Sequence, residues 1–298
     1  MRRIAGVAAT LIAALFGMLP PTGWSKEPQA QVPVSTAEEQ LARGDAAWRA
    51  GRLDTAVFHY LKADTLEPAS DIALLRLGAL HESAGRRDLA IRLWRLAAAR
   101  NPRNGLTWQR LGFARLAETD PGTAAGDFAR ALEIDAGLWR AHLGAALAAE
   151  TLADLTAAQR HLDTALALQP SSAELLGHSA RIALRLGHGQ RARREAGAAL
   201  VLAPNLPIAR LVVGDLQALD GDYAAALEAY HRVLAEAPAY ERLGERALER
   251  GDTHRAVQFF DEAIEASPVH LESARQRRAV ARERLSTLPV LDTSPVKE

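Results

Sequence analysis

Small, aromatic and proline residues recur along this chain at intervals of about 34 residues, and helix-forming residues fill the intervals. Each interval has room for two antiparallel helices, because a glycine provides a turn in the middle and a proline cannot continue a helix interior. One such pair would leave its apolar face in water, so the period predicts a solenoid of stacked helix pairs. The first occurrence of the pattern consists of Gly44, Gly51, Ala56, Tyr60, Ala63 and Pro68.

The pattern repeats seven times, with local departures. Ala136 replaces the proline of the third repeat, and Gly144 of the fourth lies two residues early. We therefore expect the turn of the fourth repeat to be two residues longer than the others. The predicted repeats cover residues 37–70, 71–104, 105–138, 139–172, 173–206, 207–238 and 239–270.

The N-terminal segment has the layout of a secretory signal peptide. Arg2 and Arg3 precede an uncharged apolar run that ends at Leu19, and two prolines and the cleavage-site pattern Gly23-Trp24-Ser25 follow. We expect cleavage after residues 1–25 and a periplasmic or secreted protein with no stable membrane span. An uncleaved anchor helix is the alternative, although the run is short for a bilayer.

The remaining segments outside the repeats are polar. Residues 26–36 predict a flexible lead-in, 271–286 a charged capping helix, and 287–298 a disordered tail. Two helix starts show the spacing of a capping box. These pairs are Thr36 with Glu39 and Ser171 with Glu174.

The pattern resembles that of the tetratricopeptide repeat family, in an exported bacterial form, over residues 37–270. The resemblance implies an all-α, right-handed α-solenoid of about seven tandem helix-turn-helix repeats with a C-terminal capping helix. It also implies a scaffold whose first helices line a concave groove for a peptide segment or helix of another protein. The groove is where we expect the function to lie.

Composition and motifs favour a binding protein over an enzyme. The formal net charge is zero, which favours no nucleic-acid partner, and cysteine is absent. The stretch from Gly187 to Ala192 matches a dinucleotide fingerprint but follows no predicted strand, and the nine histidines show no metal-binding spacing. No block of 60 or more residues outside the repeats could hold a catalytic domain. We therefore expect no enzymatic activity, no metal and no cofactor.

One row of positions on the predicted first helices is rich in basic residues. It lies two residues before the small packing residue of each repeat and reads Ala42, Arg76, Arg110, His142, His178, Val212 and Arg242. Arg181 and Arg185 lie on the same helix face as His178. The row predicts a basic stripe for an acidic partner, and an ordinary solvated face is the alternative. Trp48 and Phe113 are candidate apolar anchors, with packing inside the solenoid as the alternative.

We expect the partner-binding role to serve assembly of a bacterial cell-envelope complex. Two other interpretations remain open. The chain could be a structural spacer or a self-associating subunit of an export machine, which makes a homo-oligomer possible. It could also be a regulatory subunit of a carbohydrate-processing enzyme.

Overall fold

The computed structural model describes residues 35–267 and 271–287, and every regular element in these ranges is an α-helix. The predicted signal peptide 1–25, most of the lead-in 26–36 and most of the tail 287–298 lie outside the described residues. In chain order the helices are α2 (Ala37–Arg49), α3 (Leu53–Leu66), α4 (Ile72–Ser83), α5 (Arg87–Arg100), α6 (Gly105–Ala117), α7 (Pro121–Ile134), α8 (Trp139–Thr151), α9 (Leu155–Leu168), α10 (Ala173–Arg185), α11 (Gly189–Leu202), α12 (Pro207–Asp220), α13 (Tyr223–His231), α14 (Glu236–Arg250), α15 (Thr253–Ala266) and α16 (Leu271–Thr287).

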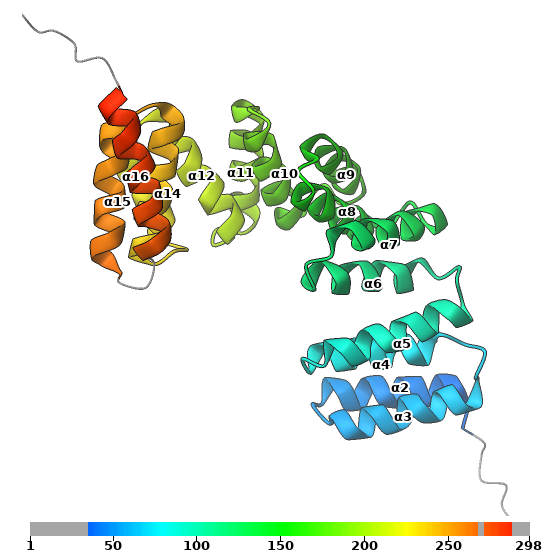
Figure 1. Ribbon diagram of the computed structural model, residues 1–298. Helices are drawn as coiled ribbons and strands as arrows, with labels where there is room; N and C mark the ends of the chain where they lie inside the picture. The colour runs from blue at the N-terminus through cyan, green and yellow to red at the C-terminus, as the bar shows by residue number, and fades with distance from the viewer. Residues whose placement is uncertain (1–34, 268–270, 288–298) are drawn as a thin grey trace, which may run out of the picture.

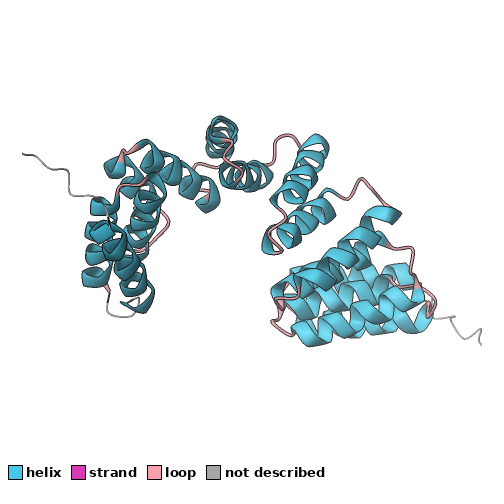
Figure 2. Ribbon diagram, turned by 45° about the horizontal axis from the view of Figure 1, so that its top comes forward, coloured by secondary structure: helices cyan, strands magenta, loops and turns pink. Residues whose placement is uncertain are grey.

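Consecutive helices form antiparallel pairs, and the pairs stack along an open arc (Figure 1). Helices α2 to α5 form one end of the arc and α14 to α16 the other (Figures 1 and 2). The prediction of an all-α solenoid of tandem helix pairs is confirmed. Within the described ranges, no helix combines the length and the apolarity that crossing a bilayer requires.

In five repeats a glycine on the first helix lies directly against an aromatic ring on the second helix. A Cβ atom added at any of these glycines would lie 2.2–2.7 Å from the ring, which no neighbour tolerates without moving. The absent side chain therefore sets the close approach of the two helices. The pairs are Gly44 with Tyr60, Gly78 with Trp94, Gly112 with Phe128, Gly214 with Tyr230 and Gly244 with Phe260.

One of the two predicted helix caps is confirmed and the other is wrong. The Thr36 hydroxyl accepts the backbone N–H of Glu39 at 3.1 Å, as expected. Helix α10, however, begins one residue later than the sequence pattern indicates. Its cap is therefore Ser172, whose hydroxyl accepts the N–H of Leu175 at 3.3 Å, and Ser171 lies outside the helix.

The prediction of a longer turn in the fourth repeat is also wrong. Three residues separate α8 from α9, as they separate α2 from α3. The buried Ala146 occupies the place of the packing glycine, 34 residues after Gly112. Gly144 has a different neighbour, because an added Cβ would lie 2.2 Å from Phe128 of the preceding repeat. The early glycine was therefore not a shifted copy of the repeat pattern.

Helix α16 packs against α15 and α14 at the C-terminal end of the stack. Ala274 and Ala281 are buried there, while Arg278 forms an ion pair with Asp261 at 2.5 Å. Small buried residues on the packed face and exposed, mostly polar residues on the rest of the helix are the pattern that ends a solenoid in water.

Candidate functional site: the first-helix face

The row predicted from the sequence lies on the first helices, with one correction. Because Ala146 is the packing residue of the fourth repeat, the row position there is Gly144 and not His142. His142 lies two residues from the row, and its Nδ1 is 3.1 Å from Nδ1 of His161 on α9. The row as the structure places it is Ala42, Arg76, Arg110, Gly144, His178, Val212 and Arg242.

Row residues lie against the second helix of the preceding repeat. The guanidinium of Arg110 lies 5.8 Å from the ring centroid of Trp94, and that of Arg242 lies 5.8 Å from Tyr230. At Gly144 the ring of Phe128 takes the space that a side chain would need. The row therefore belongs to the junctions between repeats as well as to the surface.

Every arginine predicted for the site is paired with an acid from the preceding repeat. Arg76 pairs with Asp45 and Arg110 with Glu82, the latter at 3.8 Å. The carboxylate of Glu150 accepts from both Arg181, at 2.5 Å, and Arg185, at 2.9 Å. Arg242 pairs with Asp215 at 2.6 Å. The arginines of the first-helix face are thus paired with acids, and the face has less unpaired positive charge than the sequence predicted.

Two of these junctions share one arrangement of aspartate, tyrosine and arginine. The Tyr60 hydroxyl donates to Asp45 at 2.7 Å, and Asp45 also pairs with Arg76 of the next repeat. The same three positions recur as Asp215, Tyr230 and Arg242, where the Tyr230 hydroxyl donates to Asp215 at 2.7 Å. Burial, followed by the hydrogen bond and the charge of the neighbouring aspartate, raises the pKa of both tyrosines.

Sequence reasoning missed the acidic members of these pairs, although a signal was present. In both junctions an aspartate directly follows the packing glycine, and a tyrosine lies 15 residues after that aspartate. Their fixed place directly after the packing glycine distinguishes these two aspartates from the other aspartates of the chain.

His178 is held in its neutral form at the junction of the fourth and fifth repeats. Arg181 Nη2 donates to His178 Nδ1 at 3.1 Å, which requires a lone pair on that nitrogen. Burial, together with the charge of Arg181, lowers the pKa of His178 to about 4. Burial likewise lowers the pKa of His142. These two row candidates are therefore uncharged hydrogen-bonding groups near neutral pH.

The two predicted aromatic anchors are partly buried and packed. Phe113 meets Phe128 edge to face, with ring centroids 5.0 Å apart. Trp48 packs against the core of the first repeat and also lines a shallow depression with Asp45 and Arg49. Each ring contributes to packing, and Trp48 additionally presents an edge to the surface.

The first-helix face has a larger depression of about 500 Å³ between α2 and α4. Its lining mixes both charges with apolar side chains, a composition suited to a peptide rather than to a reacting small molecule. Among residues 35–267 and 271–287 no group of three or more histidine, aspartate or glutamate side chains is arranged to hold a metal ion. The lining residues are Glu38, Leu41, Ala42, Asp45, Glu67, Ile72 and Arg76.

Comparison with known proteins identifies the repeat. The profile of the tetratricopeptide repeat matches in three overlapping stretches, 143–207, 179–241 and 214–270. No curated protein sequence matches this chain significantly.

Solved structures resemble the chain in fold at low sequence identity. A tetratricopeptide repeat protein from Parabacteroides merdae is 18% identical with a TM-score of 0.57, covering 83% of this chain and 98% of that one. PilF of Pseudomonas aeruginosa is 16% identical with a TM-score of 0.59, covering 73% and 96%. PilW, described as a widely conserved type IV pilus biogenesis factor, is 19% identical with a TM-score of 0.59, covering 70% and 97%. The chain thus carries tetratricopeptide repeats over residues 143–270, and the helix pairs of the remaining described residues continue the fold that these structures share.

Proposed function

We propose that this protein is a non-enzymatic scaffold that binds an extended segment or a helix of another protein on its first-helix face. The observation that carries the proposal is the continuity of that face. Neighbouring first helices are joined by ion pairs on this face, such as Arg76 with Asp45 and Arg181 with Glu150. A surface continuous over many repeats suits an elongated ligand.

The matched charges of the face alter the kind of partner that we propose. Because Arg76, Arg181 and Arg242 already have carboxylate partners, an acidic ligand must share them with Asp45, Glu150 and Asp215. Arg110 is the least committed of the row, since its distance to Glu82 is 3.8 Å. A segment of mixed polarity, contacting Arg110 and the depression between α2 and α4, fits this face best.

The setting that we propose is assembly of a bacterial cell-envelope complex, in the periplasm or outside the cell. Two observations support it. The segment 1–25 has the pattern of a secretory signal peptide. PilW, which shares the fold, is described as a pilus biogenesis factor.

Site-specific photo-cross-linking in cells tests the binding face. A photoreactive residue placed at Ala42 or Arg110 on first helices should form an adduct with another protein. The matched controls are Leu61 and Val201, which are exposed on second helices. Adducts from the second-helix positions alone, or none at any position, would overturn the proposal. An adduct between two copies of this chain would instead favour the spacer or self-associating subunit.

A further inference from the structure

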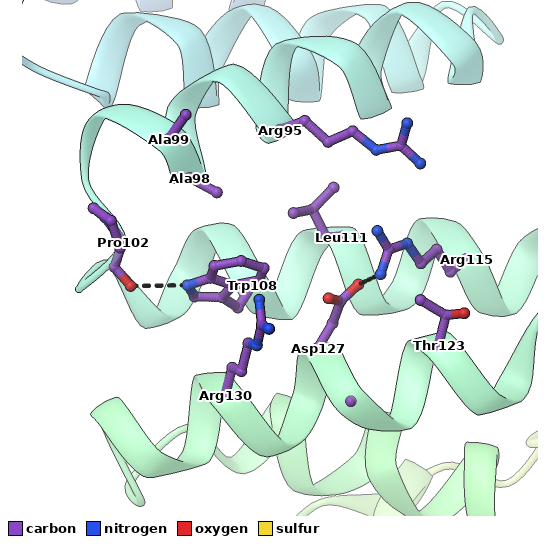
Figure 3. Close-up of a pocket in the computed structure, with 11 residues that line it drawn as sticks. Arg95, Ala98, Ala99, Pro102, Trp108, Leu111, Arg115, Thr123, Asp127 and Arg130 are labelled. Carbon is purple, nitrogen blue, oxygen red and sulfur yellow. Dashed lines mark hydrogen bonds and ion pairs between the residues drawn. The ribbon is translucent and has the colours of Figure 1, made fainter.

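A pocket of about 670 Å³ lies between the second and third repeats, on the side of the second helices (Figure 3). Helix α6 runs between α5 and α7 and contributes the middle of the lining. Pro102 and Trp108 lie at one end and Arg115 and Thr123 at the other. A volume of this size accommodates two or three amino-acid side chains, in the range of small-ligand pockets.

One position of the repeat carries a small residue, Ala98, in the lining of this pocket. Ala98 lies four residues after the buried Trp94 on α5. The corresponding position is leucine or isoleucine in five other repeats, while the first repeat has Asp64. Where the leucine is present, as at Leu132, it packs against the neighbouring core. The larger residues are Leu132, Leu166, Leu200, Leu234 and Ile264.

Three arginines face this pocket against a single acid. Arg115 pairs with the buried Asp127 at 2.6 Å, so these two charges neutralise each other. Arg95 and Arg130 are exposed, and the charge of Asp127 also acts on both. The lining therefore carries two more positive than negative charges beside its apolar residues.

The aromatic part of the lining is held in position before any ligand binds. Trp108 Nε1 donates to the carbonyl oxygen of Pro102 at 2.9 Å. The guanidinium of Arg130 lies 4.7 Å from the Trp108 ring centroid. A guanidinium stacked in this way keeps the N–H groups at its edge available for a carboxylate. A site that is already ordered loses less entropy when a ligand binds.

We propose that this pocket binds an acidic segment of a partner protein that carries an aromatic side chain between its carboxylates. The aromatic ring packs against Trp108 and Leu111, and the carboxylates accept hydrogen bonds from Arg95 and Arg130. The choice of a protein ligand rests on the proposed scaffold function. The site itself is separate from the first-helix face and adds a second point of contact.

A pocket at the equivalent junction near the C-terminus supports the choice of charge. It has about 550 Å³ and lies between α13, α14 and α15. Tyr240 occupies the repeat position of Trp108 there, and Glu262 occupies that of Arg130. The two pockets share their place in the repeat but differ in charge, so charge decides which ligand each admits.

Calorimetric titration of the purified chain with a synthetic peptide tests the pocket. The probe is acetyl-Asp-Glu-Phe-Glu-Asp-amide, for which we expect a dissociation constant below 1 mM. One control peptide replaces the acids by their amides, and another replaces phenylalanine by glycine. Each should bind at least tenfold more weakly. Fluorine NMR of the chain labelled with 5-fluorotryptophan gives a second measurement. The resonance of Trp108 is assigned as the one that is absent in Trp108→Phe, and in the parent chain it should shift when the acidic probe is added.

Three variants locate the binding. Arg95→Gln with Arg130→Gln should weaken binding of the probe at least tenfold. Ala98→Leu should also weaken binding, because a larger side chain narrows the pocket beside Trp108 and Leu111. Lys62→Gln is the matched control, because Lys62 occupies the position of Arg130 on α3 and is exposed. Circular dichroism verifies that each variant is folded.

The proposal is overturned if the parent chain does not bind the acidic probe. Equal binding of the amide control peptide would also overturn it, because the carboxylates would then contribute nothing to the affinity. Equal weakening by Lys62→Gln would overturn it as well, since general charge attraction would then explain the affinity. The cross-linking experiment on first helices is independent of this titration. Adducts at Ala42 without probe binding would reject the pocket alone, and probe binding without such adducts would reject the first-helix face alone.

Discussion

Arg242 holds the carboxylate of Asp215 through two hydrogen bonds, from Nε to Oδ1 at 2.7 Å and from Nη2 to Oδ2 at 2.6 Å. The two residues belong to first helices of adjacent repeats, and Asp215 also accepts the hydroxyl of Tyr230. The Asp215 side chain is 6% exposed, whereas the equivalent Asp45 is 28% exposed. The aspartate–tyrosine–arginine arrangement thus occurs twice, with a buried aspartate at Asp215 and a more exposed one at Asp45.

Asp215→Ala should be much more destabilising than Asp45→Ala. The first change leaves Arg242 and Tyr230 without their buried acceptor and should lower the free energy of unfolding by about 3 kcal/mol. The second removes a more exposed pair and should cost about 1 kcal/mol or less. Urea unfolding followed by circular dichroism measures both. Equal losses would mean that burial does not determine the strength of these junctions.

Gly144→Ala should destabilise the junction between the third and fourth repeats. The new methyl group would lie 2.2 Å from the Phe128 ring, and overpacking of this kind costs about 1–3 kcal/mol. Gly197→Ala is the control, because nothing lies within 4 Å of an added Cβ on α11, and it should stabilise by about 0.5–1 kcal/mol. Adding Phe128→Leu should recover part of the loss, which a double-mutant cycle of melting curves detects. Additive losses would contradict the contact.

Ala153→Gly should stabilise the protein by about 1 kcal/mol. Ala153 has a φ of 63° in the turn of the fourth repeat, a conformation that is costly for residues with a Cβ. The opposite change, Gly187→Ala, tests the same turn of the next repeat, where φ is 80° and no atom lies near an added Cβ. It should destabilise by a similar amount. Thermal melts that shift in the same direction for both variants would rule out backbone strain as the cause.

The stability of the chain should depend on pH through His178. Its pKa is about 4 in the folded protein, lowered by burial and by Arg181, and close to 6.5 when the chain unfolds. The unfolded chain therefore binds the proton first as the pH falls. The stabilisation is complete above about pH 6.5 and is lost towards pH 4, by at most about 3 kcal/mol.

The variant His178→Gln should remove this component of the pH dependence. The free energy of unfolding, measured in urea at several values from pH 4 to 7, should fall less steeply in the variant than in the parent. His254→Gln changes an exposed histidine on α15 and should leave the slope of the parent curve unchanged. Parallel curves for the parent and His178→Gln would show that protonation of His178 is not linked to unfolding.

The pattern of small and aromatic residues was sufficient to predict the architecture. Gly44 and Tyr60 are 16 residues apart, and the same spacing recurs in four more repeats as a direct contact. Contacts of this kind lie within one repeat, so sequence spacing determines them. The sequence also indicated the first-helix row, because a residue two positions before the packing residue keeps its place on the helix.

Features of the junctions between repeats depended on the tertiary structure. Gly144 is a glycine like the packing residues of other repeats, but it faces Phe128 of the preceding repeat. It is therefore not the packing residue, and His142, two residues before it, is not a row position. The sequence predicted a free basic stripe, whereas in the structure the arginines in and beside the row pair with Asp45, Glu150 and Asp215. Residues about 30 positions apart meet only when one helix pair is packed on the next.

The sequence by itself therefore determined the repeat, the helix pairing and the helix face that carries the row. Only the tertiary structure decided which charges neutralise each other and where space remains. The pocket at Ala98 illustrates the reason. Its lining comes from three helices, α5, α6 and α7, and Arg95, Trp108 and Arg130 surround one space only because the stacking of the repeats holds these helices side by side.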